Sequence, residues 1–367
     1  MPALKAIGTM SGTSLDGVDV ALLETDGESV LRARSTGYRP YSADERALLR
    51  AALADAAVLT DRAARPGSLR EAEALITRAH AEAVEAFLAR TKMASRDIAV
   101  IGFHGQTVLH RPMNWLTVQL GDGPALAKRL GIRVVFDFRA ADVAAGGQGA
   151  PLVPVFHRAL AQALDLPRPL AIVNIGGVAN ITYLDGDSDP IAFDTGPGNA
   201  PLDDLVSART GASFDRDGKL AARGKAHAET ITKVLANPYF GLRPPKSLDR
   251  EQFARISLDA LSTEDAAATA TAIVAASIAK AQDHLPKPPV NWIIAGGGAR
   301  NPTLMAMLHE RLAGSVMRAD KIGWSGDALE AQAFAYLAVR SLNGLPITFP
   351  TTTGVGRPLT GGVVAMP

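Results

Sequence analysis

Residues 8–19 form a polar turn, Gly8-Thr9-Met10-Ser11-Gly12-Thr13-Ser14-Leu15-Asp16-Gly17-Val18-Asp19, between the apolar runs 4–7 and 18–23. This apolar–turn–apolar pattern predicts a β-hairpin, which we expect at the edge of a first sheet. Glycines allow a backbone to approach an anion closely, and hydroxyl and N–H groups donate hydrogen bonds to it. Asp16 and Asp19 can hold a cation or its waters. The pattern favours a phosphate-binding turn over an ordinary surface turn, although GxxxxGK[ST] and its lysine are absent from the sequence.

Composition limits the function classes. A chain of 367 residues predicts two domains, and 47% apolar with 20% charged residues is typical of a globular protein. The 38 basic and 37 acidic residues give a net charge of +1, so nothing indicates nucleic acid or an anionic membrane as a partner. Cysteine is absent, which excludes disulfides and thiolate chemistry. Without a signal sequence or an apolar run of about 20 residues, we expect a cytoplasmic protein with no membrane partner.

The hydrophobic periodicity predicts an alternation of strands and helices in the first 140 residues. A passage rich in Gly, Ala and Pro at 140–154 then lacks any periodicity. We therefore predict an N-terminal lobe over 1–140 and a C-terminal lobe over 141–367. The expected helices are 42–53 and 68–91, and the expected strands are 98–103, 115–120 and 132–136.

The second lobe begins with the same strand–glycine turn–strand pattern as the first. This echo predicts a duplicated α/β fold with an ATP cleft between the two lobes. The expected strands are 170–175, 178–184, 191–193 and 292–295, and the expected helices are 202–210, 266–282, 302–312 and 327–341.

Two further glycine turns are candidates for nucleotide contacts. Residues 174–180 could surround the far side of the same polyphosphate, although a Gly-Gly pair alone is common in ordinary hairpins. Residues 295–302 place three glycines between a buried strand and a helix, where a base or ribose could lie against bare backbone. One glycine suffices for an ordinary strand-to-helix turn, so the three favour a ligand.

Asp194 is the candidate catalytic base. It follows a short strand and precedes the turn 195–199, at the strand end where ligands bind in open α/β sheets. Such a carboxylate could accept a proton from an attacking hydroxyl or water during phosphoryl transfer. Its position is equally compatible with an Asx turn or a cap for the helix after Leu202.

Other polar residues give weaker signals when taken singly. His104 follows a strand, but a lone histidine is more often a structural hydrogen-bonding residue. Arg139 can bind a carboxylate or phosphate through its forked guanidinium, although surface ion pairs are the commoner role of arginine. Glu330 is expected in a first helical turn from the helix dipole alone. Gln106, Thr107 and Asp142 complete this scattered group.

Eight motifs in order resemble the anhydro-N-acetylmuramic acid kinase family, which has the sugar kinase/actin superfold. The motifs are GTMSGTSLDGVD (8–19), GFHGQT (102–107), QLGDG (119–123), DFRAADVAAGGQGAPLVP (137–154), NIGGVANIT (174–182), FDTGPGN (193–199), AGGGARN (295–301) and GDALEAQAFA (326–335). They span the whole chain at the spacing of the family. The resemblance implies a two-lobed, actin/hexokinase-like (ribonuclease H-like) α/β fold.

The resemblance also implies an activity: ATP- and Mg²⁺-dependent conversion of 1,6-anhydro-N-acetylmuramic acid and water to N-acetylmuramic acid 6-phosphate, in peptidoglycan recycling. Asp194 would activate the water, and Glu330 would act with it at the sugar, where Thr107 and Arg139 are further substrate contacts. The implied nucleotide contacts are Gly12, Thr13, Ser14, Leu15, Asp16, Gly17, Val18, Asp19, Asn174, Gly176, Gly177, Asn180, Gly296, Gly297, Gly298 and Asn301. The metal ligands are left unassigned, and a homodimer is compatible with the sequence.

Two other functions stay open at this stage. One is a kinase of the same fold that acts on another sugar or a small carboxylate, which a substrate screen would reveal. The other is a non-catalytic nucleotide-dependent sensor, which would bind ATP without turnover. The long motifs argue against the first alternative, and Asp194 argues against the second.

Overall fold

The structure is a computed structural model, and it describes residues 1–367 except 13, 249–252, 254–255, 325 and 327. The chain forms two compact units, one made of residues 1–164 and 328–367 and the other of residues 165–327. This division differs from the predicted lobes 1–140 and 141–367. The first unit continues past residue 140, and the C-terminal 40 residues belong to it as well.

A six-stranded sheet forms the centre of the first unit, in the order β13-β7-β4-β1-β2-β3. The strands β1, β2 and β3 pair antiparallel, and β4 and β7 continue the sheet parallel to β1. A separate hairpin consists of β5 (Gln106–Arg111) and β6 (Leu116–Leu120). The six strands of the sheet are β1 (Leu4–Met10), β2 (Gly17–Thr25), β3 (Leu31–Pro40), β4 (Val100–Phe103), β7 (Val134–Phe136) and β13 (Val363–Ala365).

The predicted first hairpin is confirmed as β1 and β2, but its expected place at the sheet edge is wrong. β1 and β2 lie inside the sheet, and β3 occupies the edge next to β2. Most side chains of β3 are exposed, and its sequence LRARSTGYRP has no alternation of apolar and polar residues. The periodicity that identifies a half-buried strand is therefore missing from this segment.

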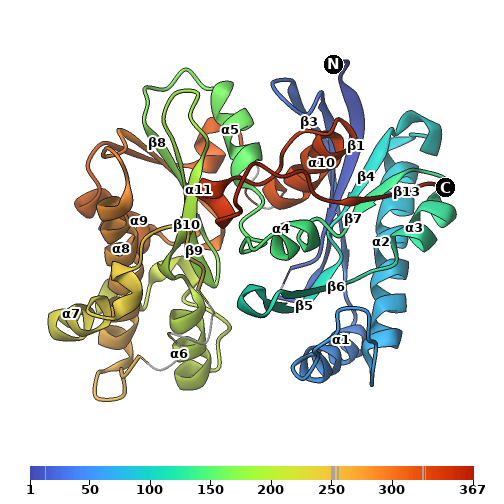
Figure 1. Ribbon diagram of the computed structural model, residues 1–367. Coiled ribbons are helices and arrows are strands. Elements are labelled where there is room, and N and C mark those ends of the chain that lie inside the picture. The colour runs from blue at the N-terminus through green and yellow to red at the C-terminus, as the bar shows by residue number, and fades with distance from the viewer. Residues whose placement is uncertain (13, 249–252, 254–255, 325, 327) are drawn as a thin grey trace. The chain divides into compact units, whose positions relative to one another are not determined.

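Helices cover both faces of this sheet (Figure 1). The helices α1 (Ala43–Ala56) and α2 (Leu69–Thr91) confirm the two predicted ones, and a capping box of Ser42 and Glu45 begins α1. α2 packs on β2 and β3, whereas α10 (Leu329–Leu342) packs on β1, β2 and β4 from the opposite side. The remaining helices of the unit are α3 (Gly123–Leu130), α4 (Ala140–Ala144), α5 (Pro154–Gln162) and α11 (Pro350–Thr353).

Gly8 explains why the C-terminal helix belongs to the first unit. A Cβ atom at this position in β1 would lie 1.7 Å from the carbonyl oxygen of Ala331 in α10. Only a glycine therefore allows the helix backbone to lie directly on the strand backbone. Gly8 thus serves helix packing, although its sequence context grouped it with the phosphate-binding turn.

The second unit repeats the sheet topology of the first. Its five strands are ordered β10-β9-β8-β11-β12, with β8, β9 and β10 antiparallel and β11 and β12 parallel to β8. The same order and directions hold for β3-β2-β1-β4-β7 in the first unit, and this is the ribonuclease H-like arrangement. The duplicated α/β fold is confirmed. The strands are β8 (Leu170–Ile175), β9 (Val178–Leu184), β10 (Ile191–Pro197), β11 (Asn291–Ala295) and β12 (Ser315–Arg318).

A largely apolar helix supports the second sheet. α8 (Thr263–Lys280) packs on β9 and β10, and α6, α7 and α9 contact α8 in turn. The core between β8, β11, α8 and α9 includes Trp292, which is fully buried. These three other helices are α6 (Ala200–Thr210), α7 (Ala228–Leu235) and α9 (Pro302–Arg311).

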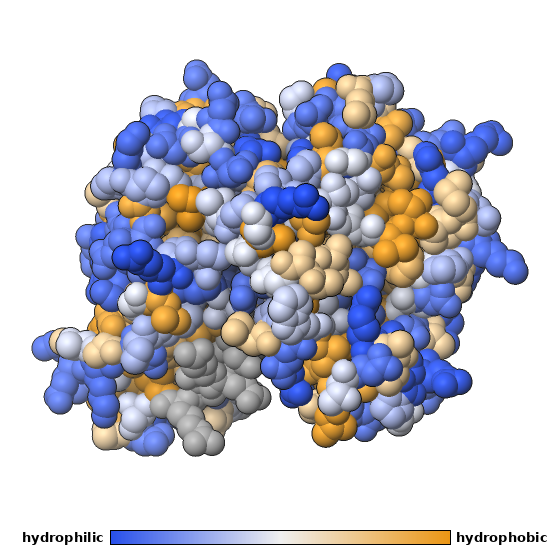
Figure 2. Space-filling view, viewed as in Figure 1, coloured by the Kyte–Doolittle hydropathy of each residue, from blue (hydrophilic) through white to orange (hydrophobic). Residues whose placement is uncertain are grey.

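The surface in view carries apolar residues in separate groups among polar ones (Figure 2). Among the described residues, none of the helices has both the length and the apolar character that crossing a membrane requires.

Candidate functional site

The first glycine turn is held by a buried hydrogen-bond network in the first unit. Ser11, fully buried, donates to Oε1 of Gln106 at 2.6 Å and lies 3.0 Å from the hydroxyl of Tyr41. Gln106 in turn donates through Nε2 to the carbonyl oxygen of Gly12 at 3.2 Å. The motifs at 8–19 and 102–107 therefore meet in space, and the second fixes the backbone of the first.

The predicted contacts of this turn fall into two structural settings. Gly12, Ser14, Leu15 and Asp16 lie in the turn itself, where Ser14 donates to Asp16 at 2.8 Å and Leu15 has a φ of +55°. Gly17, Val18 and Asp19 lie in β2 and pair with β3. Thr13 lies outside the described residues. In the described part of the turn, two exposed polar side chains can contact a ligand: the hydroxyl of Ser14 and the carboxylate of Asp16.

Arg139 is fixed at the beginning of α4 by two partners. It donates through Nη1 to the carbonyl oxygen of Gly149 at 2.9 Å, and its Nη2 lies 3.1 Å from Nε2 of His104. Burial lowers the pKa of Arg139 to about 10, and the negative charges of Glu330 and Asp142 oppose this shift. The arginine therefore stays cationic at neutral pH. Its Nε is buried and has no hydrogen-bond partner among the described residues.

His104 is an acceptor for Arg139 and not an acid–base group. Burial, followed by the charge of Arg139, lowers the pKa of His104 well below its usual value. The neutral ring can donate through Nδ1 to the carbonyl oxygen of Gly105, 2.9 Å away, which leaves Nε2 to accept from the guanidinium. Both contacts indicate that His104 is a structural hydrogen-bonding residue.

Two more of the four predicted sugar contacts, Thr107 and Glu330, lie in the same unit as Arg139. Thr107 begins β5 with Gln106 and accepts a hydrogen bond from Gln119 at 3.2 Å. Glu330 lies in the first turn of α10, and its side chain reaches the surface. The protein packed around its carboxyl raises the pKa of Glu330, and the positive charge of Arg139 opposes that shift. The first turn therefore lies in the same unit as Thr107, Arg139 and Glu330, whereas Asp194, the fourth candidate sugar contact, belongs to the second unit.

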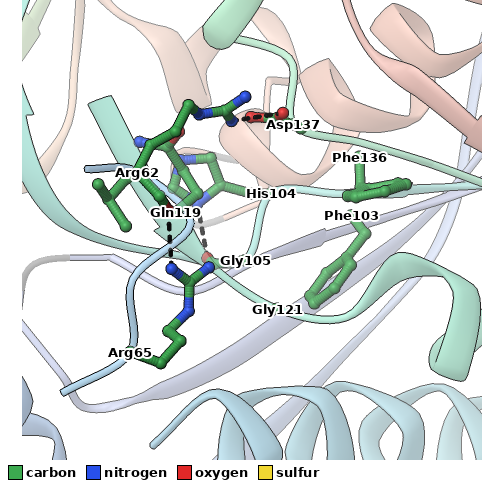
Figure 3. A pocket seen from close by; sticks show the side chains of 10 residues that line it. Arg62, Arg65, Phe103, His104, Gly105, Gln119, Gly121, Phe136 and Asp137 are labelled. Carbon is green, nitrogen blue, oxygen red and sulfur yellow. Dashed lines mark hydrogen bonds and ion pairs between the residues drawn. The ribbon is translucent and has the colours of Figure 1, made fainter. Parts of the chain in front are cut away.

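A small pocket adjoins these residues (Figure 3). It has a volume of about 100 Å³, and His104 and Gln119 are part of its lining. Arg62 pairs with Asp137 at 2.6 Å and Arg65 pairs with Glu73 at 2.8 Å, so both pocket arginines already have a carboxylate partner. The pocket is consequently balanced in charge.

Three sequence motifs converge in the second unit. The turn between β8 and β9 receives hydrogen bonds from the segment after β10: Asn199 N donates to Gly176 O at 2.7 Å, and Gly198 N donates to Gly177 O at 3.0 Å. The glycine turn after β11 lies on the same residues, because a Cβ at Gly296 would approach Oδ1 of Asn174 to 2.5 Å. The turns at 174–180, 193–199 and 295–301 thus form one continuous backbone surface.

A cavity of about 460 Å³ opens beside the third turn. Gly297 and Asn301 line it together with the beginning of α6 and the loop 213–217. Phe214 on this loop is 48% exposed, and the guanidinium of Arg216 lies 5.2 Å from the centre of its ring. Asn301 caps α9 by accepting a hydrogen bond from Leu304 N at 3.0 Å, so its side-chain oxygen already has a structural role.

Asp194 lies in β10 opposite Asn180 of β9, which is the last residue of the second glycine motif. The register shifts directly after it, between Asp194 and Gly196, and such a bulge redirects a side chain. Its Oδ2 accepts a hydrogen bond from Leu248 N at 2.7 Å. The carboxylate is therefore held in place by Leu248, on the strand that runs toward the second glycine turn.

The protonation of Asp194 is shifted toward neutral pH. Burial raises its pKa from 3.8 to about 7, although the hydrogen bond from Leu248 acts in the opposite direction. A carboxylate with a pKa near the working pH suits a general base. The sequence also allowed Asp194 to form an Asx turn or to cap the next helix. The hydrogen bond that its side chain accepts comes from Leu248 instead, and the N-cap residue of α6 is Asn199.

Sequence reasoning missed two parts of this site. The segment 239–248, which contacts Asp194, has no glycine motif or hydrophobic period that would single it out. The aromatic loop at 213–217 was missed because its sequence, SFDRD, reads as an ordinary polar loop. Only the fold shows that Phe214 faces a cavity beside the third turn.

Two ribonuclease H-like units, each with a glycine turn between its first two strands, define the actin/hexokinase-like class of two-lobed proteins. Within this class, the sequence model of the anhydro-N-acetylmuramic acid kinase family matches residues 4–367. The chain belongs to this family.

Relatives agree over their full lengths. The chain is 59% identical over 365 residues to the anhydro-N-acetylmuramic acid kinase of Nitrobacter winogradskyi, with 99% of this chain and 100% of the relative covered. It is 57% identical over 365 residues to the enzyme of the same name from Bradyrhizobium diazoefficiens, at the same coverage.

Among solved structures, component A of (R)-2-hydroxyglutaryl-CoA dehydratase from Acidaminococcus fermentans is similar, with a TM-score of 0.50 at 12% identity. The alignment covers 93% of this chain and 99% of that one, and at this identity the likeness concerns the fold alone.

Proposed function

We propose that this protein phosphorylates 1,6-anhydro-N-acetylmuramic acid with ATP while adding water, and so produces N-acetylmuramic acid 6-phosphate. The observation that carries the proposal is the register of β9 and β10, in which Asp194 pairs with Asn180, the last residue of the second glycine motif. A carboxylate whose pKa is raised to about 7, on the strand that leads to this glycine turn, supports the proposed role of Asp194 as the base. We infer the identity of the sugar substrate from the family to which the chain belongs.

In the proposed reaction, Asp194 removes a proton from water as the water oxygen bonds to C1 of the sugar. The C1–O6 bond breaks, and O6 uses the freed electron pair to attack the γ-phosphorus of ATP, which releases ADP. Developing positive charge at C1 is stabilised by a nearby carboxylate, and we assign this role to Glu330. Arg139 and Thr107 would orient the sugar through hydrogen bonds.

The nucleotide would contact all three glycine turns. We assign the phosphates to residues 12–19 and 174–180 and the nucleoside to residues 296–301, with its base in the cavity beside Phe214. Stacking on an aromatic face suits every purine. Mg²⁺ bound with the nucleotide would neutralise charge on the phosphates, and the exposed carboxylate of Asp16 is placed to bind such an ion or its waters.

A coupled ADP-release assay with the anhydro sugar, followed by mass analysis of the product, tests the proposal. We expect the product to gain the mass of one phosphoryl group and one water. A gain of the phosphoryl group alone would leave a sugar kinase and remove the water-activating role of Asp194. ADP release with another sugar only would identify the alternative kinase, and ATP binding without any turnover would identify a sensor.

A further inference from the structure

The main chain of Asp194 lies in the edge strand of the second sheet. β10 is an edge strand of the second unit, with β9 on one side and no further strand on the other in the described sheet. Edge strands leave alternate N–H and C=O groups without a strand partner. A catalytic residue at such an edge therefore depends on other parts of the chain to fix its backbone.

The segment Tyr239–Leu248 supplies that support at Asp194. Asp194 N donates to Lys246 O at 3.0 Å, and the hydroxyl of Tyr239 donates to Asp194 O at 2.6 Å. Leu248 N donates to the side-chain Oδ2 at 2.7 Å. One segment thus engages the N–H, the C=O and the carboxylate of the same residue.

Lys246 joins the two ends of this segment through a hydrogen bond to Tyr239. Its side chain is 8% exposed, and Nζ donates to the carbonyl oxygen of Tyr239 at 3.1 Å. The ammonium lies 4.7 Å from the ring centre of Tyr239 and 5.6 Å from that of Phe193. These contacts connect both ends of the segment to the strand residue that precedes Asp194.

The contacts of His284 support the same arrangement. Its Nε2 lies 2.8 Å from Phe240 O and 3.3 Å from Nζ of Lys246. If Nε2 of His284 carries a hydrogen and donates it to Phe240 O, it cannot also accept a hydrogen bond from the ammonium of Lys246. The acceptor for Lys246 is then Tyr239 O.

A packed aromatic cluster forms the base of the segment. Tyr239, Phe240 and Phe253 are buried, and their ring centres lie 5.6 to 6.1 Å apart. Lysines are rarely buried in proteins because desolvating the charge is costly. A buried lysine and a buried tyrosine hydroxyl that both serve one short segment indicate a role beyond filling space.

We infer that Tyr239 and Lys246 are positioning residues, which hold the segment 239–248 so that it fixes the carboxylate of Asp194 for proton abstraction. The inference rests on the proposed role of Asp194. Catalytic geometry tolerates displacements of only about 0.5 Å, so loosening this segment should reduce turnover without changing how substrates bind.

Tyr239→Phe tests the inference in the full chain, because it removes the hydroxyl and keeps the ring. We expect kcat to fall about 10- to 100-fold with the KM for each substrate within about twofold of wild type. Tyr336→Phe is the matched control: Tyr336 is equally buried and donates to Glu28 O at 3.0 Å in the first unit. It should lower the melting temperature and leave kcat unchanged.

Lys246→Met provides a second variant of similar length and volume, and it should lower kcat in the same way. A folded Tyr239→Phe with kcat within twofold of wild type, or with only KM raised, would overturn the inference. Loss of folding in both variants while Tyr336→Phe folds would assign the segment a purely structural role, and would also overturn it.

A crystal structure of Lys246→Met separates this inference from the proposed function. We expect the carboxylate of Asp194 to move by about 0.5 Å or more, or to occupy two conformations. An unmoved carboxylate would overturn the inference whatever the substrate. Absence of wild-type turnover on the anhydro sugar would instead refute the proposed function alone.

Discussion

Replacing Asp194 with asparagine should lower turnover and, at neutral and higher pH, raise the free energy of unfolding. Asparagine has nearly the same shape, and its side-chain oxygen can still accept the hydrogen bond from Leu248 N. It cannot take a proton from water. We therefore expect turnover to fall about 10²- to 10⁴-fold while ATP binding stays close to that of the wild type.

The same change should stabilise the protein at neutral and higher pH. Burial raises the pKa of Asp194 from 3.8 to about 7, so the folded state holds the proton more tightly than the unfolded state. The stability that this proton contributes is fully present below pH 3.8 and is lost as the pH rises through about 7. The loss is about 2 kcal/mol at pH 5 and about 4 kcal/mol at pH 8, and Asp194→Asn avoids it.

Urea unfolding at pH 5 and pH 8 measures this difference, with the fluorescence of Trp292 as a probe in the core of the same unit. Asp26→Asn is the control. Burial would raise the pKa of Asp26, but hydrogen bonds from the backbone N–H groups of Glu28, Val30 and Ser29 outweigh it and lower that pKa. This variant should lose stability equally at both pH values and keep its kcat.

Two results would refute the reasoning. If Asp194→Asn kept more than about a tenth of the wild-type turnover, the carboxylate would not be the base. If the stability gained by Asp194→Asn over the wild type did not increase between pH 5 and pH 8, burial would not raise the pKa of Asp194 in the folded state. The wild-type kcat/KM for the sugar, measured at saturating ATP, should also fall about tenfold for each pH unit below 7.

Three further variants test packing, nucleotide binding and sugar binding. Gly8→Ala should lower the free energy of unfolding by about 3 kcal/mol or more, because the new Cβ would overlap Ala331 O; a loss below about 1 kcal/mol in urea unfolding would contradict this packing. Phe214→Ala should raise the KM for ATP about tenfold with no effect on that for the sugar, and an unchanged ATP KM would remove the base from this cavity. Arg139→Met should raise the KM for the sugar about tenfold or more through the loss of charged hydrogen bonds, whereas a rise for ATP instead would reassign Arg139 to the nucleotide.

The sequence alone determined the elements with strong periodicity and the turns with marked composition. The strands at 170–175 and 178–184 agree with β8 and β9 to the residue, and the helix at 68–91 agrees with α2 within one residue. The echo between residues 4–25 and 170–184 predicted a duplicated α/β fold, which the identical strand orders confirm. Such signals are local, because burial of one face imposes its period on neighbouring residues.

Tertiary structure decided what depends on contacts between distant residues. The exposed edge strand β3 carries no apolar alternation, so pairing with β2 alone defines it. The helix α10 joins the first unit because Gly8, more than 300 residues earlier, leaves room for its backbone. The segment 239–248 supports Asp194 through backbone groups and a tyrosine hydroxyl. Backbone donors and acceptors are the same at every residue, so the sequence cannot show which of them will meet, and only the folded chain selects them.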